Sequence, residues 1–183
     1  MSMNNCQDPV TLLPIDASCH RSAGGIKRIL LANKSDIATV TVDPLTGEIS
    51  AITLKVGKAF VEWKFRNNTG SVTSTFASDQ ATGNETVTSV LSLQFSRAES
   101  AKRLAIQTAI NSNAVVIVED AYGQFLYLGY DRDVYVSGGS MVTGTSSSDL
   151  NGFTLEFTDE SIEFPHFISS LVDVESLKVA SAE

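Results

Sequence analysis

Short runs in which apolar and polar residues alternate, with turn sequences between them, constrain the fold of this chain more than any other feature. The clearest run extends from residue 59 to residue 66. Its apolar face consists of Ala59, Val61, Trp63 and Phe65, and its other face consists of Phe60, Glu62, Lys64 and Arg66. A period of two is that of a β-strand with one buried face. Similar short runs continue as far as Ile168, and they predict a mainly β protein with an antiparallel sandwich or barrel.

Turn sequences between the runs predict which strands pair. The sequence Asp-Pro-Leu-Thr-Gly at residues 43–47 predicts a hairpin across residues 37–54, because Pro presets φ and Gly accepts a positive φ. The sequence Asp-Ala-Tyr-Gly at residues 120–123 likewise predicts that residues 115–119 pair with residues 124–130. Residues 67–70 (Asn-Asn-Thr-Gly) are expected to turn the strand at 59–66 back onto residues 71–76.

One segment has helical periodicity. Ala98, Ala101, Ala105 and Ala109 recur at helical spacing, so the sequence predicts a single flanking α-helix over about 97–111. Ser96 and Glu99 stand three residues apart at its start, which is the spacing of a capping box. A further strand around Ile162, Phe164 and Phe167 is expected after the last alternating run, Leu150 to Thr158. Residues 134–143 form another expected strand, broken at Gly138-Gly139.

These patterns divide the chain into three parts. Residues 1–25 have no period and are expected to form an extended N-terminal arm, and residues 26–168 are expected to form a single sandwich domain. Residues 169–183 are a C-terminal tail in which apolar residues at spacing three allow a short helix or a docking arm. Within the domain, residues near 59–86 form an extended hairpin rich in Ser and Thr. That hairpin is either a solvated loop or a strand pair free to join another chain.

The charge distribution argues against tight nucleic-acid binding. The chain has 13 Lys and Arg against 21 Asp and Glu, a net charge of −8. Residues 1–70 hold 8 basic and 6 acidic residues, whereas residues 71–183 hold 5 basic and 15 acidic residues. A protein that grips nucleic acid needs basic side chains at the phosphates. The acidic excess is therefore interpreted as a solubility device, or as the wall of a conduit that must not retain DNA.

No residue pattern predicts catalysis, a cofactor or a metal site. Cys6, Cys19 and His20 lack the paired spacing of zinc ligands. Asp131 and Asp133 flank Arg132 and could attract a cation, although a solvated loop is the favoured interpretation. The longest apolar run, Ala114 to Val118, has five residues, too few for a membrane-spanning helix, and no secretory signal is visible at the start.

The order of motifs from Val87 to Ile168 resembles a known group of virion proteins. A core strand over residues 86–95 leads to the helix, then to the strand-turn-strand of residues 114–129, which ends in Leu-Gly. A Thr-Gly pair at 143–144, an Asp-x-Asn-Gly sequence at 149–152 and an aromatic-alternating strand follow. This order is similar to that of tail-tube and tail-ring proteins of phages that infect Bacteroides and its relatives, including crAss-like phages.

The resemblance implies a non-enzymatic structural protein of the tail or neck, which is assembled in the host bacterial cytoplasm and located in the virion. It implies rings of six-fold or twelve-fold symmetry, stacked on neighbouring rings or on the portal, with DNA passing through without specific binding and with no membrane partner. The arm, the hairpin and the tail would then lie between subunits. The candidate interface residues are Trp63, Asn67, Asn68, Thr73, Thr75, Phe76, Leu171 and Leu177.

A second hypothesis of a different class is a carbohydrate- or protein-binding sandwich. Trp63, Tyr122, Tyr127 and Tyr130 could form an aromatic binding platform, although packing in a core or an interface is the favoured interpretation of these rings.

Overall fold

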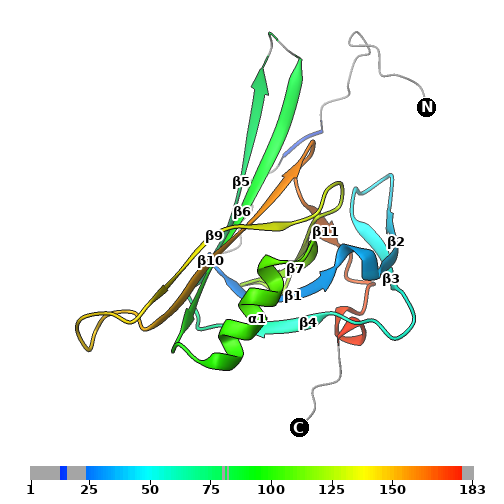
Figure 1. The fold of residues 1–183 in the computed structure, drawn as a ribbon. Helices are drawn as coiled ribbons and strands as arrows, with labels where there is room; N and C mark the ends of the chain where they lie inside the picture. Colours follow the sequence, from blue (N-terminus) through cyan, green and yellow to red (C-terminus); the bar gives the residue numbers. More distant parts are fainter. Residues whose placement is uncertain (1–12, 16–23, 80, 82, 179–183) are drawn as a thin grey trace.

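Two β-sheets and one α-helix make up the fold of this chain in the computed structural model, which describes residues 13–15, 24–79, 81 and 83–178 (Figure 1). The larger sheet has seven strands in the order β2 (Ile37–Val42), β3 (Ile49–Leu54), β11 (His166–Ile168), β8 (Phe125–Leu128), β7 (Ala114–Asp120), β1 (Ile26–Asn33) and β4 (Val61–Lys64). The smaller sheet has four strands in the order β5 (Gly70–Asp79), β6 (Asn84–Ser96), β10 (Gly152–Ser161) and β9 (Tyr135–Val142). All paired strands are antiparallel except β3 and β11. The predicted mainly β sandwich with one flanking helix is confirmed.

The main core lies between the two sheets and beneath the helix α1 (Ser100–Ile110). Alternate residues of the smaller sheet face this core, and among them are Phe153, Leu155 and Phe157 of the alternating run 150–158, with at most 6% of each residue exposed. A second cluster covers the opposite face of the larger sheet. Because β7 lies between the two clusters, Ala114 to Val118 are buried on both faces, which accounts for their unbroken apolar sequence.

Two of the predicted hairpins are confirmed. β2 pairs with β3, and Gly47 at the turn has a φ of 71°, with its N–H donating to the Asp43 carbonyl at 2.8 Å. β7 pairs with β8, and Gly123 has a φ of 82°. The Asp120 side chain fixes this turn by accepting from the N–H groups of Tyr122 and Gln124, both at 2.8 Å. In both turns the residue that must adopt a positive φ is glycine.

The third predicted hairpin, between residues 59–66 and 71–76, is wrong. β4 pairs with β1 in the larger sheet, whereas β5 pairs with β6 in the smaller one. The chain crosses from one sheet to the other between them, with Asn68 at a φ of 62°. Burial explains the crossing, because Trp63 and Phe65 pack against the main core, while the Ser/Thr-rich strand β5 follows β6 over ten residue pairs. The projecting hairpin therefore spans residues 70–96 rather than 59–86.

Phe60 lies, as the alternation predicts, on the face of its strand opposite Trp63 and Phe65, but it is not exposed to solvent there. That face of β4 is turned toward the second cluster, where Phe60 is fully buried. Its N–H donates to the Leu177 carbonyl at 2.8 Å, which attaches the C-terminal segment to the body. The C-terminal tail, for which a short helix or a docking arm was expected, contains a short 3₁₀ helix, η2 (Val174–Leu177), with Val174 in the same cluster. Arg28 binds both Glu62 and Glu175 and so joins this segment to β1 and β4.

Three further expectations need correction. The capping box does not form. Ser96 is the last residue of β6, and the strand pairing continues past it, because the Arg97 N–H donates to the Asn151 carbonyl. Glu99 precedes the helix and makes no side-chain cap. The strand expected around Ile162, Phe164 and Phe167 is only the three-residue β11. Gly138-Gly139 does not break β9, whose pairing with β10 continues past an irregularity beside these glycines.

Candidate subunit interface

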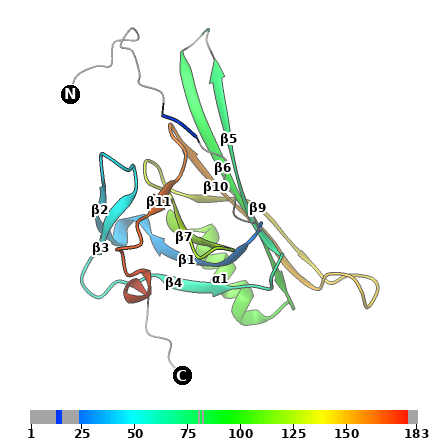
Figure 2. The ribbon, with the colours of Figure 1, turned by 180° about the vertical axis from the view of Figure 1, so that it is seen from behind.

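The smaller sheet ends on both sides in a strand that has no further partner among the described residues. These edge strands are β5, with ten residues, and β9, with eight. Both views of the ribbon show the β5–β6 hairpin extending well beyond the body of the molecule (Figures 1 and 2). Proteins commonly protect such edges with Lys or Pro. Neither residue type occurs in β5 or β9, so these edges can accept another strand.

The direction of the β5 peptide groups follows from one hydrogen bond at its base. The Gln94 N–H donates to the Thr69 carbonyl at 2.8 Å, and this pair sets the alternation of the antiparallel ladder. Every second residue from Thr69 onward therefore directs its peptide groups to β6. Val72, Ser74 and Phe76 lie at the intervening positions, so their N–H and C=O groups point to the open edge.

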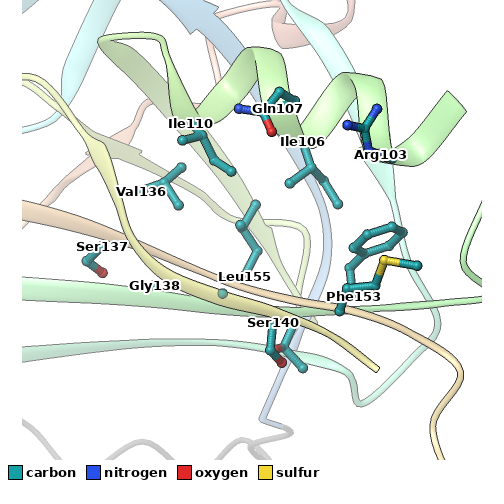
Figure 3. Close-up of a pocket in the computed structure, with 13 residues that line it drawn as sticks. Arg103, Ile106, Gln107, Ile110, Val136, Ser137, Gly138, Ser140, Phe153 and Leu155 are labelled. Atoms are coloured by element: carbon teal, nitrogen blue, oxygen red, sulfur yellow. The ribbon is translucent and has the colours of Figure 1, made fainter. Parts of the chain in front are cut away.

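A groove of about 450 Å³ runs along the open edge of β9 (Figure 3). Consecutive β9 residues from Val136 to Met141 line one wall, and α1 forms the other wall with Arg103, Ile106, Gln107 and Ile110. Ile110 and Met141 are 46% and 58% exposed, which leaves large apolar side chains in water. An edge strand beside a helix, with apolar residues between them, is a geometry that accepts an added strand.

Phe76, on the opposite edge strand β5, is also a large apolar side chain that is exposed to water. It pairs with buried Val87, so it lies on the core-facing side of the sheet, yet 49% of it is exposed because the hairpin extends past the core. Met141 pairs with buried Phe153 and lies on the same side. A β5 strand placed beside the β9 strand of another copy therefore carries Phe76 on the side where Ile110 and Met141 are exposed.

The face of the smaller sheet that is turned away from the core is polar and has no positive charge. The four strands contain no Lys or Arg, although they contain five acidic residues: Asp79, Glu85, Glu156, Asp159 and Glu160. Register and alternation place mainly small hydroxyl side chains on this face: Ser71, Thr73, Thr75, Thr86, Thr88, Ser92, Ser140 and Thr154. Glu156 and Glu160 share it, so its charge is negative.

The structure brings some of the predicted interface residues together and separates others. Thr73, Thr75 and Phe76 are exposed on the open edge strand β5, and Asn67 and Asn68 are exposed at its base. The remaining three lie elsewhere, in the body and at the C-terminal segment. The ring of Trp63 packs against those of Phe95 and Phe157, at centroid distances of 5.6 and 6.3 Å respectively. Leu171 is 89% exposed, whereas Leu177 packs on the second cluster.

Sequence reasoning missed the groove between α1 and β9. Ile110 belongs to the apolar stripe of the predicted helix and Met141 to a predicted strand, and neither pattern shows that the side chain stays exposed. The Gly138-Gly139 pair was the one available signal, since glycines in a strand indicate a close approach or exposed backbone.

The structure does not assemble the four aromatic residues of the second hypothesis into one platform. Tyr127 is 1% exposed and belongs to the second cluster, whereas Trp63 packs on the main core across the same sheet. Tyr130 makes an edge contact with the ring of His166 at 4.8 Å.

Of the residues considered as metal ligands, Asp131 and Asp133 lie in the described part of the chain. Asp131 accepts a hydrogen bond from the Ser161 hydroxyl at 2.9 Å. Within the described part of the chain, no group of three or more His, Cys, Asp or Glu residues is placed to hold a metal ion. Cys6, Cys19 and His20 lie outside the described residues. No helix in the described ranges is long and apolar enough to cross a membrane.

Asp159, at the end of β10, is the buried carboxylate of the small sheet, with 4% exposure. Its Oδ2 accepts from the Gly129 N–H at 3.0 Å, and its Oδ1 is buried without a hydrogen-bond partner among the described residues. Burial raises the pKa of Asp159, against the lowering effects of the Gly129 N–H and of Lys34. The folded state therefore retains this proton to a higher pH than the unfolded state does.

This raised pKa predicts a pH-dependent difference between the natural chain and Asp159→Asn. As pH rises from about 4 to about 7, the free energy of unfolding of the natural chain should fall relative to that of Asp159→Asn. The reason is that the Asp159 carboxyl ionises first in the unfolded state, which then binds fewer protons than the folded state. Asp159→Ala is the control; it leaves the Gly129 N–H unpaired and should cost about 1–3 kcal/mol. Urea unfolding across this range measures both effects. A difference that instead moves in favour of the natural chain as pH rises would contradict the prediction.

Comparisons with known proteins give no match: no family model, no curated protein and no solved structure matches this chain.

Proposed function

We propose that this chain is a ring-forming structural subunit of a tailed-phage virion, in the tail tube or the neck. In this proposal it is not an enzyme and acts without a cofactor. Copies of the chain associate around a symmetry axis, six-fold or twelve-fold, and stack on neighbouring rings or the portal. DNA passes along the axis without specific binding.

The observation that carries this proposal is the composition and topology of the smaller sheet. Its two edges are open, its exposed face is covered with Ser, Thr and Glu, and its four strands contain no basic residue. A sheet of this kind is unsuited to gripping nucleic acid, since phosphate binding needs Lys and Arg. A negatively charged, hydroxyl-rich wall suits a channel that DNA must leave quickly.

The two edges differ from one another, which determines the kind of assembly. β5 carries the exposed Phe76, and β9 carries the groove with Met141 and Ile110. Pairing β5 of one copy with β9 of the next is a head-to-tail contact, and such a contact closes into a ring when the rotation between copies closes. β5 and β9 run antiparallel within the sheet, so the joined strands continue its antiparallel pattern.

Sedimentation velocity and negative-stain imaging of the full chain test the proposal. We expect the mass to increase with concentration toward one closed oligomer, and we expect annular particles with a central hole. A chain that stays monomeric at high concentration, over a wide range of salt, would count against ring formation.

A further inference from the structure

A second groove separates α1 from the other sheet. It has a volume of about 500 Å³, and it is lined by small and apolar residues of β1, β4 and α1. Val61 and Leu104 in this lining are 51% and 66% exposed. A smaller cavity that shares Trp63 and Ala105 extends the groove toward Lys64 and Lys102. The surface is distinct from the open edges of the smaller sheet.

The N-terminal segment presents the complementary side chains. Leu13 and Ile15 are 84% and 97% exposed, so neither is covered by the part of its own chain that the structure describes. Residues two apart in an extended chain point to the same side, so both aliphatic side chains can enter one groove while Pro14 faces away. In both ribbon views the described segment 13–15 lies toward the β10–β11 end of the molecule and not beside α1 or β4 (Figures 1 and 2).

The distribution of charge also fits contact between this N-terminal segment and the groove. Residues 55–66, which include β4, carry four basic residues and one acidic residue in a chain of net charge −8. The side chains of Lys58 and Lys64 are 50% and 75% exposed. Lys58 binds the carboxylate of Asp36 in the groove at 3.2 Å, and Lys64 binds that of Glu62 at 3.5 Å. The aliphatic stretch of the arm is flanked in the sequence by Asp8 and Asp16.

We propose that the segment around Leu13–Ile15 of one copy docks in the groove between α1 and β4 of another copy. The 11 peptide links from Ile15 to Ile26 span at most about 40 Å when extended, so the segment can reach well beyond the body of its own chain. Burial of two aliphatic side chains supplies the apolar driving force, and the net positive charge of residues 55–66 attracts the acidic flanks. This contact does not depend on pairing between β5 and β9, so the two proposals can fail separately.

Photo-crosslinking of the full chain tests this contact. Benzoylphenylalanine replaces Leu13, chains labelled with ¹⁴N and ¹⁵N are mixed, and the crosslinked peptides are identified by mass spectrometry. We expect crosslinks to α1 and to β4 that join chains of different isotope. Benzoylphenylalanine in place of Leu45, which is 94% exposed in the β2–β3 turn, is the matched control and should give none there.

A groove variant separates docking from chance proximity. Leu104→Asp places a charge among the apolar lining, and we expect the mixed-isotope crosslinks to fall about tenfold or more, since at least one leucine-sized contact is lost. Because Leu104 is largely exposed, circular dichroism should show an unchanged fold; Val61→Asp provides a second variant if it does not. Crosslinks within single chains only, or crosslinks outside the groove, would overturn the proposal. Phe76→Asp should leave the mixed-isotope crosslinks in place.

Discussion

In the Leu104→Asp background, which removes docking of the N-terminal segment, Phe76→Asp and Met141→Asp should each reduce the full chain to monomers, and mixing the two variants should restore one contact per pair. Phe76→Asp damages the β5 edge and leaves β9 and its groove intact, whereas Met141→Asp does the reverse. A head-to-tail interface then permits a heterodimer and nothing larger, since each outer edge of that dimer carries a charged residue. Sedimentation velocity of each variant, and of the equimolar mixture, measures the result.

The folded state should tolerate both substitutions. Phe76 and Met141 are 49% and 58% exposed, so little core packing is lost, and urea unfolding of each variant provides the control. Leu45→Asp, at a turn far from both edges in the sequence, should assemble like the natural chain. Two outcomes would contradict the head-to-tail interface: rings that persist in either single variant, or a mixture that forms rings as readily as the natural chain.

Gly152→Ala should cause the largest loss of stability from adding a single methyl group. A Cβ at Gly152 would lie 1.9 Å from the Phe95 carbonyl oxygen, and backbone atoms of Phe95 and Ser96 lie at 3.0 Å. The clash is with backbone at the paired ends of β6 and β10, so relief requires these strands to separate. We expect a loss of roughly 3 kcal/mol, with a fall in Tm of about 10 °C for a chain of this size.

Gly138→Ala is the matched control. Its added Cβ meets only the Glu156 carboxylate oxygen at 3.4 Å, at the end of a side chain that can move. Replacing this strand glycine should change the free energy of unfolding by about 0.5 kcal/mol or less. Thermal unfolding of the two variants measures the difference. Equal effects from both substitutions would contradict the close approach of β6 and β10 at Gly152.

Local chemistry made a large part of the fold predictable. The β2–β3 and β7–β8 hairpins depend on turn residues that act over four or five positions, so the sequence alone identifies them. The same holds for α1, whose alanine spacing predicts the helix, although its start at Ser100 depends on how far β6 continues its pairing with β10.

Part of the candidate interface could also be predicted from the sequence. The high Ser and Thr content predicted either a solvated loop or a strand pair free to join another chain, and Thr73, Thr75 and Phe76 lie on an open edge. The partner edge β9 could not be predicted in this way. Its groove exists because α1 lies beside a strand about 30 residues later in the chain, which no local pattern encodes.

The amino-acid sequence determined the period-two strands, the two glycine turns, the helix, and a smaller sheet without a basic side chain, because each is a property of neighbouring residues or of composition. Tertiary structure decided which strands pair, and therefore which edges stay open. The run 59–66 shows the reason: its alternation holds in either sheet, and only the burial of Phe60, Trp63 and Phe65 against two different clusters selects β1 as its neighbour. Strand pairing is chosen by burial summed over distant segments, and that sum cannot be computed from one segment at a time.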